Sequence, residues 1–188
     1  MRKGHQVVDF NKKMDFGDLV LLDFTSLGPE EVEMVRNWRN HETVRKWMYD
    51  SDIISRERHH VFIEGLRSDH RNAYWIVRNK AEDYLGVVYL NRVDFNNKNA
   101  FLGIYVNPDN HMRGSGHILM DCLKRLAFGE MRLHTLKLEV VGGNSQAVDF
   151  YRREGFRDEG RLKEFVFKDG NWYDVIIMGS INKDSGHA

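Results

Sequence analysis

Two glycines, Gly114 and Gly116, stand where residues 107–121 pass from a polar loop into an apolar stretch with helical spacing. Glycine in a helix lowers its stability by about 1 kcal/mol relative to alanine, so two glycines at this point require an explanation. The start of a helix carries unpaired N–H groups and partial positive charge, and the missing Cβ atoms let a phosphate or pyrophosphate approach them closely. Arg113 would add a charge-assisted contact to such an anion.

The glycine pair leaves a second interpretation open, in which it only satisfies the backbone geometry of a strand-to-helix turn. The loop is not a nucleoside-triphosphate loop, because the pattern G-x-x-x-x-G-K-[ST] is absent. It also differs from the dinucleotide fingerprint G-x-G-x-x-G, since Leu119 occupies the third glycine position.

A second strand-loop-helix segment brings Asn144 and Tyr151 to one helix face, because they are seven residues apart. Asn144 is a good N-cap, and a buried tyrosine is often a core residue whose hydroxyl needs a partner. Both side chains therefore have a structural explanation beside a functional one.

Apolar periodicity and turn signals predict an α/β fold with one domain over residues 18–182, between an N-terminal extension (1–17) and a polar tail (183–188). The expected strands are 18–27, 73–78, 84–93, 100–106 and 135–142, with two more around the turn at Asp169 and Gly170; the expected helices are 29–48, 55–68, 114–129 and 144–155. The order is β-α-α-β-β-β-α-β-α-β-β. Both glycine-bearing loops then lie at the rim where open α/β sheets bind ligands.

Composition limits the classes of function. The 188 residues include 28 Lys and Arg against 28 Asp and Glu, so the net charge is zero and nucleic acid is not an expected partner. No apolar run approaches the roughly 20 residues of a membrane span, and the first residues lack the apolar region of a secretory signal. Cys122 is expected to be a small core residue, and no ligand cluster predicts a metal, so the expectation is a cytoplasmic protein.

The two loop motifs together resemble a known superfamily. The segment HMRGSG before an apolar helix is similar to the acetyl-CoA loop [Q/R]-x-x-G-x-[G/A] of the GCN5-related N-acetyltransferases. Residues 144–156, NSQAVDFYRREGF, resemble the N-x-x-A-x-x-x-Y-x-x-x-G-F segment of the same superfamily. The resemblance spans residues 18–181 and implies a mixed, mostly antiparallel seven-stranded sheet flanked by about four helices.

The resemblance also implies roles for particular residues, with acetyl-CoA as co-substrate. Tyr151 would be the general acid that protonates the leaving thiolate while an amine attacks the acetyl carbon directly. Asn144 would contact the coenzyme arm. The residues implied to hold the coenzyme through their backbone are Arg113, Gly114, Ser115, Gly116 and His117 for the pyrophosphate, and Ile104, Tyr105 and Val106 for the pantetheine arm.

The sequence departs from the superfamily pattern at two positions. His111 stands where the loop usually begins with Gln or Arg, which removes a side-chain anchor but leaves the backbone cradle. Phe101 stands where many relatives carry a glutamate that is discussed as general base. Glu139 on the neighbouring strand is a candidate base, although an outward-facing strand residue and deprotonation through a water chain are the alternatives.

The first helices bear on the acceptor. The segment around Trp38 and Arg39 resembles the W-R-N segment of ribosomal-protein alanine acetyltransferases and of sugar-nucleotide N-acetyltransferases. Within the second group, the pattern is most similar to the enzymes of pseudaminic-acid synthesis that acetylate a UDP-4-amino-4,6-dideoxy sugar. A guanidinium matches phosphate oxygens well, and indole rings can line a sugar site. Arg39, Trp38 and Trp47 are therefore the candidate acceptor-binding residues.

Several alternatives stay open at this point. Trp38 and Trp47 also fit core positions, and the basic residues of the first helices alternate with acidic ones, as on a solvated helix face. The acceptor could instead be a protein N-terminus or a polyamine, and the chain could be a non-catalytic acyl-CoA-binding module. Similar proteins often form homodimers through their terminal strands, which makes a homodimer a further expectation.

Overall fold

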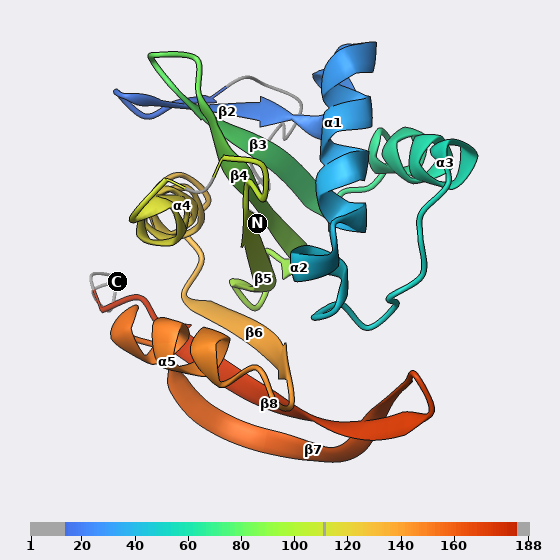
Figure 1. The fold of residues 1–188 in the computed structure, drawn as a ribbon. Helices are drawn as coiled ribbons and strands as arrows, with labels where there is room; N and C mark the ends of the chain where they lie inside the picture. The colour runs from blue at the N-terminus through green and yellow to red at the C-terminus, as the bar shows by residue number, and fades with distance from the viewer. Residues whose placement is uncertain (1–13, 111, 184–188) are drawn as a thin grey trace.

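The computed structural model describes residues 14–110 and 112–183, which form one mixed sheet with helices on both faces (Figure 1). The strand order is β1-β2-β3-β4-β5-β6-β8-β7. The strands are β1 (Met14–Asp15), β2 (Leu19–Asp23), β3 (Ala73–Asn79), β4 (Tyr84–Asp94), β5 (Asn99–Val106), β6 (Thr135–Val141), β7 (Arg157–Lys168) and β8 (Asn171–Ile181). The helices are α1 (Pro29–Asn40), α2 (Glu42–Arg45), α3 (Arg56–Leu66), α4 (Ser115–Lys124) and α5 (Ser145–Arg153).

The predicted fold class is confirmed, but the described part of the chain has eight strands instead of seven, and five α-helices. The extra strand is β1, which pairs with β2 through Met14↔Leu21 and Asp15↔Val20. A tight turn makes this pairing possible, because Gly17 has a φ of 81° and its N–H donates to the Asp15 carboxylate at 2.9 Å. Of the expected extension and tail, residues 1–13 and 184–188 lie outside the described residues.

Two expected elements are shorter than predicted because a polar side chain ends each of them. The strand expected over 18–27 ends at Asp23, whose carboxylate accepts the Thr25 N–H at 2.7 Å and turns the chain into a short helical turn at 24–26. The helix expected over 29–48 breaks at His41, which takes an extended conformation and accepts the Thr43 N–H through Nδ1.

The sheet has an apolar core on each face. On one face α4 and α5 pack their buried stripes, including Leu119, Leu123 and Val148, against β3 to β6. On the other face α1 and α3 cover the sheet and contribute Val35 and Ile63. Figure 1 shows α4 and α5 on one side of the sheet and α1 and α3 on the other.

The sheet splits between β5 and β6. These are its only parallel neighbours among the described strands, and they pair over three positions, from Asn99↔Thr135 to Phe101↔Lys137. Beyond Phe101, β5 continues against β4 as far as Val106, whereas β6 continues against β8 as far as Val141. The two backbones therefore diverge, and one edge of β5 is left without a strand partner among the described residues.

The alignment of β5 against β4 depends on Gly86, where we expect substitution to be costly. Gly86 has a φ of 151°, and an added Cβ would lie 2.3 Å from the Tyr105 carbonyl oxygen and 2.9 Å from the Val106 Cα. Because both obstacles are backbone, Gly86→Ala should lower the free energy of unfolding by about 2–3 kcal/mol. Urea unfolding measures this. Gly65→Ala is the control, because nothing lies within 4 Å of its added Cβ; equal stability of the two variants would contradict the expected clash.

Candidate active site

The glycine loop ends in a left-handed residue that starts α4. Gly114 is the N-cap with a φ of 89°, and an added Cβ there would meet open space. The first intrahelical bond is Ile118 N–H to Gly114 O, so the geometry of a helix start leaves the N–H groups of Gly116 and His117 without intrahelical acceptors. The loop therefore presents bare backbone donors, as an anion site requires.

The other predicted members of the loop have separate structural partners. The Ser115 hydroxyl donates to the Met112 carbonyl at 2.9 Å, and the His117 ring is 2.8 Å from the Glu154 carboxylate beyond the end of α5. An added Cβ on Gly116 would lie 3.3 Å from the Phe150 ring, so Gly116 lets α4 and α5 approach closely. Arg113 is exposed, and His111 lies outside the described residues.

Tyr151 is buried on α5, in the core on the α4 side of the sheet. Its ring is 9% exposed and packs edge-on against Phe150 and Phe156. Burial raises the pKa of the Tyr151 phenol to about 12, so the hydroxyl keeps its proton at neutral pH. Asn144 serves as the N-cap of α5, since its side chain accepts the Ala147 N–H at 3.1 Å.

The side chains of β5 divide between the two faces of the sheet. Ile104 and Val106 pack with the core on the α4 side. Tyr105 points to the opposite face, where it lines a cavity of about 480 Å³ together with Tyr74 and Tyr89. Burial raises the pKa values of Tyr89 and Tyr105 above the usual tyrosine value. The free edge of β5 thus lies between the glycine-loop side and this cavity.

Residues 46–54, hereafter the strap, form one wall of the cavity. The Lys168 ammonium, on β7, donates to the carbonyls of Lys46 and Met48, and the second of these bonds is 3.5 Å long. The Tyr49 hydroxyl donates to the Glu139 carboxylate on β6 at 2.8 Å. At the other end, the Ile54 N–H donates to the Asn40 side chain at 2.8 Å. The strap is therefore anchored to three separate parts of the fold.

Two buried polar groups in the cavity lack partners among the described residues. Arg39 donates to the Asp50 carbonyl through Nη2 at 2.8 Å, while its Nη1 is buried and unpaired. His59 is 4% exposed, and its Nδ1 is also unpaired. Burial and the nearby Arg36 lower the pKa of His59 to about 4, so the ring is neutral at neutral pH. Unpaired buried polar groups at a cavity wall are suited to hydrogen-bond a ligand.

Glu139 lines the cavity and does not face outward into solvent. Arg92 donates to its two oxygens at 3.1 and 3.4 Å, and Tyr49 donates to Oε2. Burial and this contact raise the pKa of Tyr49 above its usual value. Both carboxylate oxygens therefore accept hydrogen bonds from other side chains, and a role of Glu139 as base stays a prediction.

The two candidate tryptophans have different positions. Trp47 lines the cavity and is 37% exposed. Trp38 is 2% exposed in the core between α1 and the sheet, where its indole N–H donates to Asp109 at 2.8 Å, and it does not line the cavity. Tyr49 and His59 also line the cavity. Arg92 was not predicted from the sequence, because it reaches the cavity only through long-range packing.

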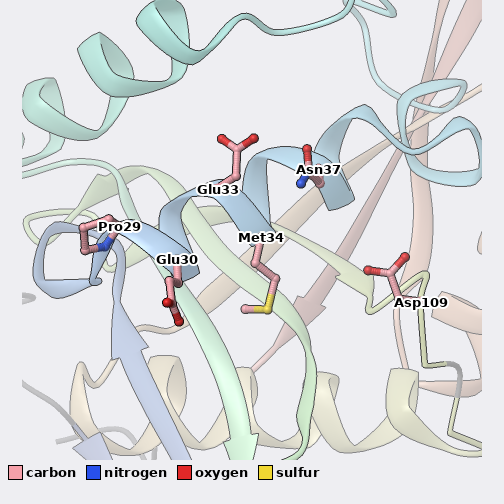
Figure 2. A pocket seen from close by; sticks show the side chains of 6 residues that line it. All are labelled: Pro29, Glu30, Glu33, Met34, Asn37 and Asp109. Atoms are coloured by element: carbon pink, nitrogen blue, oxygen red, sulfur yellow. The ribbon is translucent and has the colours of Figure 1, made fainter.

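A second, open hollow of about 550 Å³ lies beside the start of α1, lined by Pro29, Glu30, Glu33, Met34, Asn37 and Asp109 (Figure 2). Two of the three carboxylates that line it have partners. Glu33 pairs with Arg36 at 2.6 Å, and Asp109 accepts the Trp38 indole N–H. Hydrogen bonds from Arg36 and Arg56 lower the pKa of Glu33 to about 2. None of the predicted site residues lines this hollow.

Two further structural findings concern the described residues alone. Within residues 14–110 and 112–183, no group of three or more His, Cys, Asp or Glu side chains is arranged to hold a metal ion. Over the same ranges, no helix is both long enough and apolar enough to cross a membrane.

Comparison with known proteins identifies the class to which this architecture belongs. The family described as acetyltransferase (GNAT) domain matches residues 25–177. The chain belongs to the GNAT acetyltransferase family and is an acyltransferase.

Individual relatives share most of the chain. Acetyltransferase PseH of Campylobacter jejuni is 30% identical over 145 residues, which are 77% of this chain and 88% of that protein. Spermidine N(1)-acetyltransferase of Vibrio cholerae is 22% identical over 157 residues, 84% of this chain and 91% of that protein. The crystal structure of spermidine N-acetyltransferase from Vibrio cholerae in complex with CoA and spermine has a TM-score of 0.79 at 22% identity, covering 87% of this chain and 95% of that one. That structural likeness shows the fold.

The buried neutral His59 predicts a pH dependence of stability. In the unfolded chain this histidine binds a proton near the ordinary histidine pKa of 6.5, whereas in the folded chain it does so only near 4. The unfolded state therefore holds more protons between these values, and stability falls as the pH drops. Between pH 7.5 and 5 this group should cost about 2 kcal/mol.

Urea unfolding at the two pH values measures this effect in the original chain and in His59→Gln. The variant should lose about 2 kcal/mol less on acidification. His60→Gln is the control, because His60 is the exposed neighbour and its removal should leave the pH dependence in place. Identical pH dependence in the original chain and His59→Gln would overturn the assignment of a buried neutral ring.

Proposed function

We propose that the protein is an acetyl-CoA-dependent N-acetyltransferase that acetylates the amine of a nucleotide-linked amino sugar, of the UDP-4-amino-4,6-dideoxy type. The charge balance of the cavity is the observation that supports this class of acceptor. Its two carboxylates are paired, Asp50 with Arg58 at 2.6 Å and Glu139 with Arg92 at 3.1 Å. Arg39 has no carboxylate partner among the described residues, so the cavity carries a surplus positive charge.

The coenzyme lies, in this proposal, across the split in the sheet. The pyrophosphate is held at the start of α4 by the backbone of residues 113–117, where Gly114 leaves the N–H groups accessible. The pantetheine arm pairs with the free edge of β5 along residues 104–106, in the manner of an added strand. Asn144, at the start of α5, contacts the arm from the other side of the split.

The reaction is then a direct acyl transfer. The free amine of the sugar attacks the thioester carbonyl carbon and forms a tetrahedral intermediate, and the C–S bond breaks as the carbonyl re-forms. Tyr151 gives its phenolic proton to the sulfur, and the nitrogen loses a proton to water or to a base reached through water. A buried phenol that keeps its proton at neutral pH suits the role of acid.

The shape and chemistry of the cavity agree with a deoxy sugar as acceptor. Aromatic rings of Phe101, Tyr74 and Tyr89 line it and would cover a methyl group. The unpaired Nη1 of Arg39 would donate to a hydroxyl or phosphate oxygen of the acceptor. The unpaired Nδ1 of His59 would accept a hydrogen bond from a hydroxyl group. The sequence resemblance to sugar-nucleotide N-acetyltransferases and the 30% identity to Acetyltransferase PseH support the same class.

A polyamine acceptor is the main alternative, because the Vibrio cholerae relative is a spermidine acetyltransferase by name. A polycation requires carboxylates that are free to pair with it. In this cavity the carboxylates of Asp50 and Glu139 are occupied by arginines, and the remaining charge of Arg39 would repel a second cation. The cavity therefore favours an anionic acceptor over a polycationic one.

An acceptor panel tests the proposal. Purified protein with acetyl-CoA should acetylate a UDP-4-amino-4,6-dideoxy sugar. Its kcat/KM for this sugar should be at least a hundredfold higher than its kcat/KM for spermidine or for N-terminal peptides. Arg39→Gln should raise KM for the sugar nucleotide about tenfold, in keeping with loss of one charged contact. Arg56→Gln is the matched control and should leave KM unchanged, because Arg56 is exposed, pairs with Glu33 and lies outside the cavity. Activity confined to spermidine or to peptides would refute the acceptor class.

Substitution of Tyr151 tests the acid separately. Tyr151→Phe keeps the buried ring but removes the proton donor, so kcat should fall by more than tenfold while acetyl-CoA affinity changes little. In the unsubstituted enzyme, loss of this proton should not reduce kcat between pH 7 and 10, because the pKa is about 12. Tyr84→Phe, which removes a hydroxyl bonded to Glu31, is the control. Unchanged turnover in Tyr151→Phe would exclude the acid role.

A further inference from the structure

A groove of about 480 Å³ adjoins the cavity and shares a wall with it. Four residues line both hollows: Phe62, Tyr74, Asn91 and Arg92. The groove then continues along α3 over the exposed faces of Val61 and Gly65 toward the start of β3. An elongated ligand could therefore occupy the cavity with one end and the groove with the other.

Arg92 is held at this shared wall by an unusual backbone conformation. It has a φ of 54° and lies where the pairing of β4 with β5 shifts register between Asn91 and Asp94. The Asn72 side chain accepts its backbone N–H at 3.1 Å, and Asp69 in turn accepts the Asn72 amide at 2.6 Å. Such irregularities re-aim a side chain, and strained residues collect at functional sites.

The re-aimed guanidinium lies between the two hollows. It stacks over the Phe101 ring at 4.4 Å and reaches Glu139, yet 56% of the Arg92 side chain remains exposed. Two of the guanidinium N–H donors bind Glu139, and a guanidinium has five, so donors on the exposed side remain for a phosphate group while the Glu139 pair is kept. Arg92 is thus a donor available at the junction.

The groove offers apolar surface along α3, and its one carboxylate, Asp69, already accepts hydrogen bonds from the Arg71 and Asn72 N–H groups and the Asn72 amide. Val61 is 70% exposed and Phe62 is 39% exposed. Phe62 meets the Tyr74 ring edge-on at 5.0 Å, and Tyr74 stacks on Tyr89 at 4.8 Å, so a row of rings leads from the groove into the cavity. The exposed Phe62 ring beside a cation suits a planar base that follows a diphosphate.

We propose that the groove binds the nucleoside end of the acceptor and that Arg92 binds its diphosphate, with the amino sugar in the cavity beyond. This inference rests on the proposed function, because it concerns the same acceptor. It adds a subsite on α3 and a phosphate-binding residue on β4, neither of which the loop motifs indicate.

Gly65→Leu tests the subsite because it fills the groove. Nothing lies within 4 Å of an added Cβ at Gly65, and leucine is a better helix former than glycine, so the variant should fold. Calorimetric titration with UDP is done in saturating coenzyme A, so that UDP does not bind at the start of α4. UDP should bind the original protein, and Gly65→Leu should weaken it at least tenfold. Gly129→Leu, an exposed helical glycine with equal space on the α4 side, is the matched control.

Arg92→Gln tests the phosphate contact. It should weaken UDP about tenfold but leave the weaker binding of uridine unchanged, and Arg92→Lys should restore part of the UDP affinity because it restores the charge. Failure of UDP to bind the original protein, or equal UDP affinity in Gly65→Leu, would overturn the proposal.

The outcome is separable from that of the proposed function. If UDP binds in this pattern but the amino sugar is not acetylated, the subsite stands and the acceptor assignment fails. If the sugar nucleotide is acetylated with the same KM in Gly65→Leu as in Gly129→Leu, the acceptor assignment stands and the subsite fails.

Discussion

The short parallel contact between β5 and β6 is the constraint on which the rest of the architecture depends. Parallel neighbours need a crossover, and α4 with its connection to β6 supplies it. Three residue pairs hold the strands together, and the divergence beyond Phe101 leaves main-chain groups of β5 unpaired. Unpaired strand edges invite another chain or ligand to pair with them. The free edge of β5 thus separates the α4 side of the sheet from the tyrosine-lined cavity on the other face.

The cavity is shaped by contacts between segments that are distant in sequence. Lys168 is 9% exposed, and its ammonium fixes carbonyls of the strap from more than a hundred residues away. Tyr49 joins the strap to β6 through Glu139 and meets the Phe165 ring of β7 at 6.3 Å. The terminal hairpin therefore supports this wall of the cavity as well as completing the sheet. A loop held at both ends can present Trp47 and Asp50 to a ligand without losing much entropy on binding.

The parts of the structure that were predicted correctly depend on signals within short segments of the sequence. The glycine loop, the Asn144 cap and the position of Tyr151 follow from spacing within single segments, and the hairpin turn at Asp169 and Gly170 follows from its dipeptide. Trp38 and Arg39 are adjacent on a helix, about 100° apart, so the sequence could not show which of them faces the cavity. The irregularity at Arg92 depends on a contact with Asn72, which is distant in sequence, whereas the break at His41 and the pairing of Met14 depend on local hydrogen bonds to polar side chains. These were the features that periodicity could not reveal.

The charge of the cavity also bears on how an amine loses its proton without an obvious base. Glu139 is occupied by Arg92 and Tyr49, and Phe101 supplies no carboxylate. A like charge disfavours a second cation, so in the proposed complex an ammonium group near Arg39 would have its pKa lowered, and burial would lower it further. The amine is then largely neutral when it reaches the thioester, and the one proton that it must still lose leaves after the attack. One surplus arginine would in this way both select an anionic acceptor and make its amine nucleophilic.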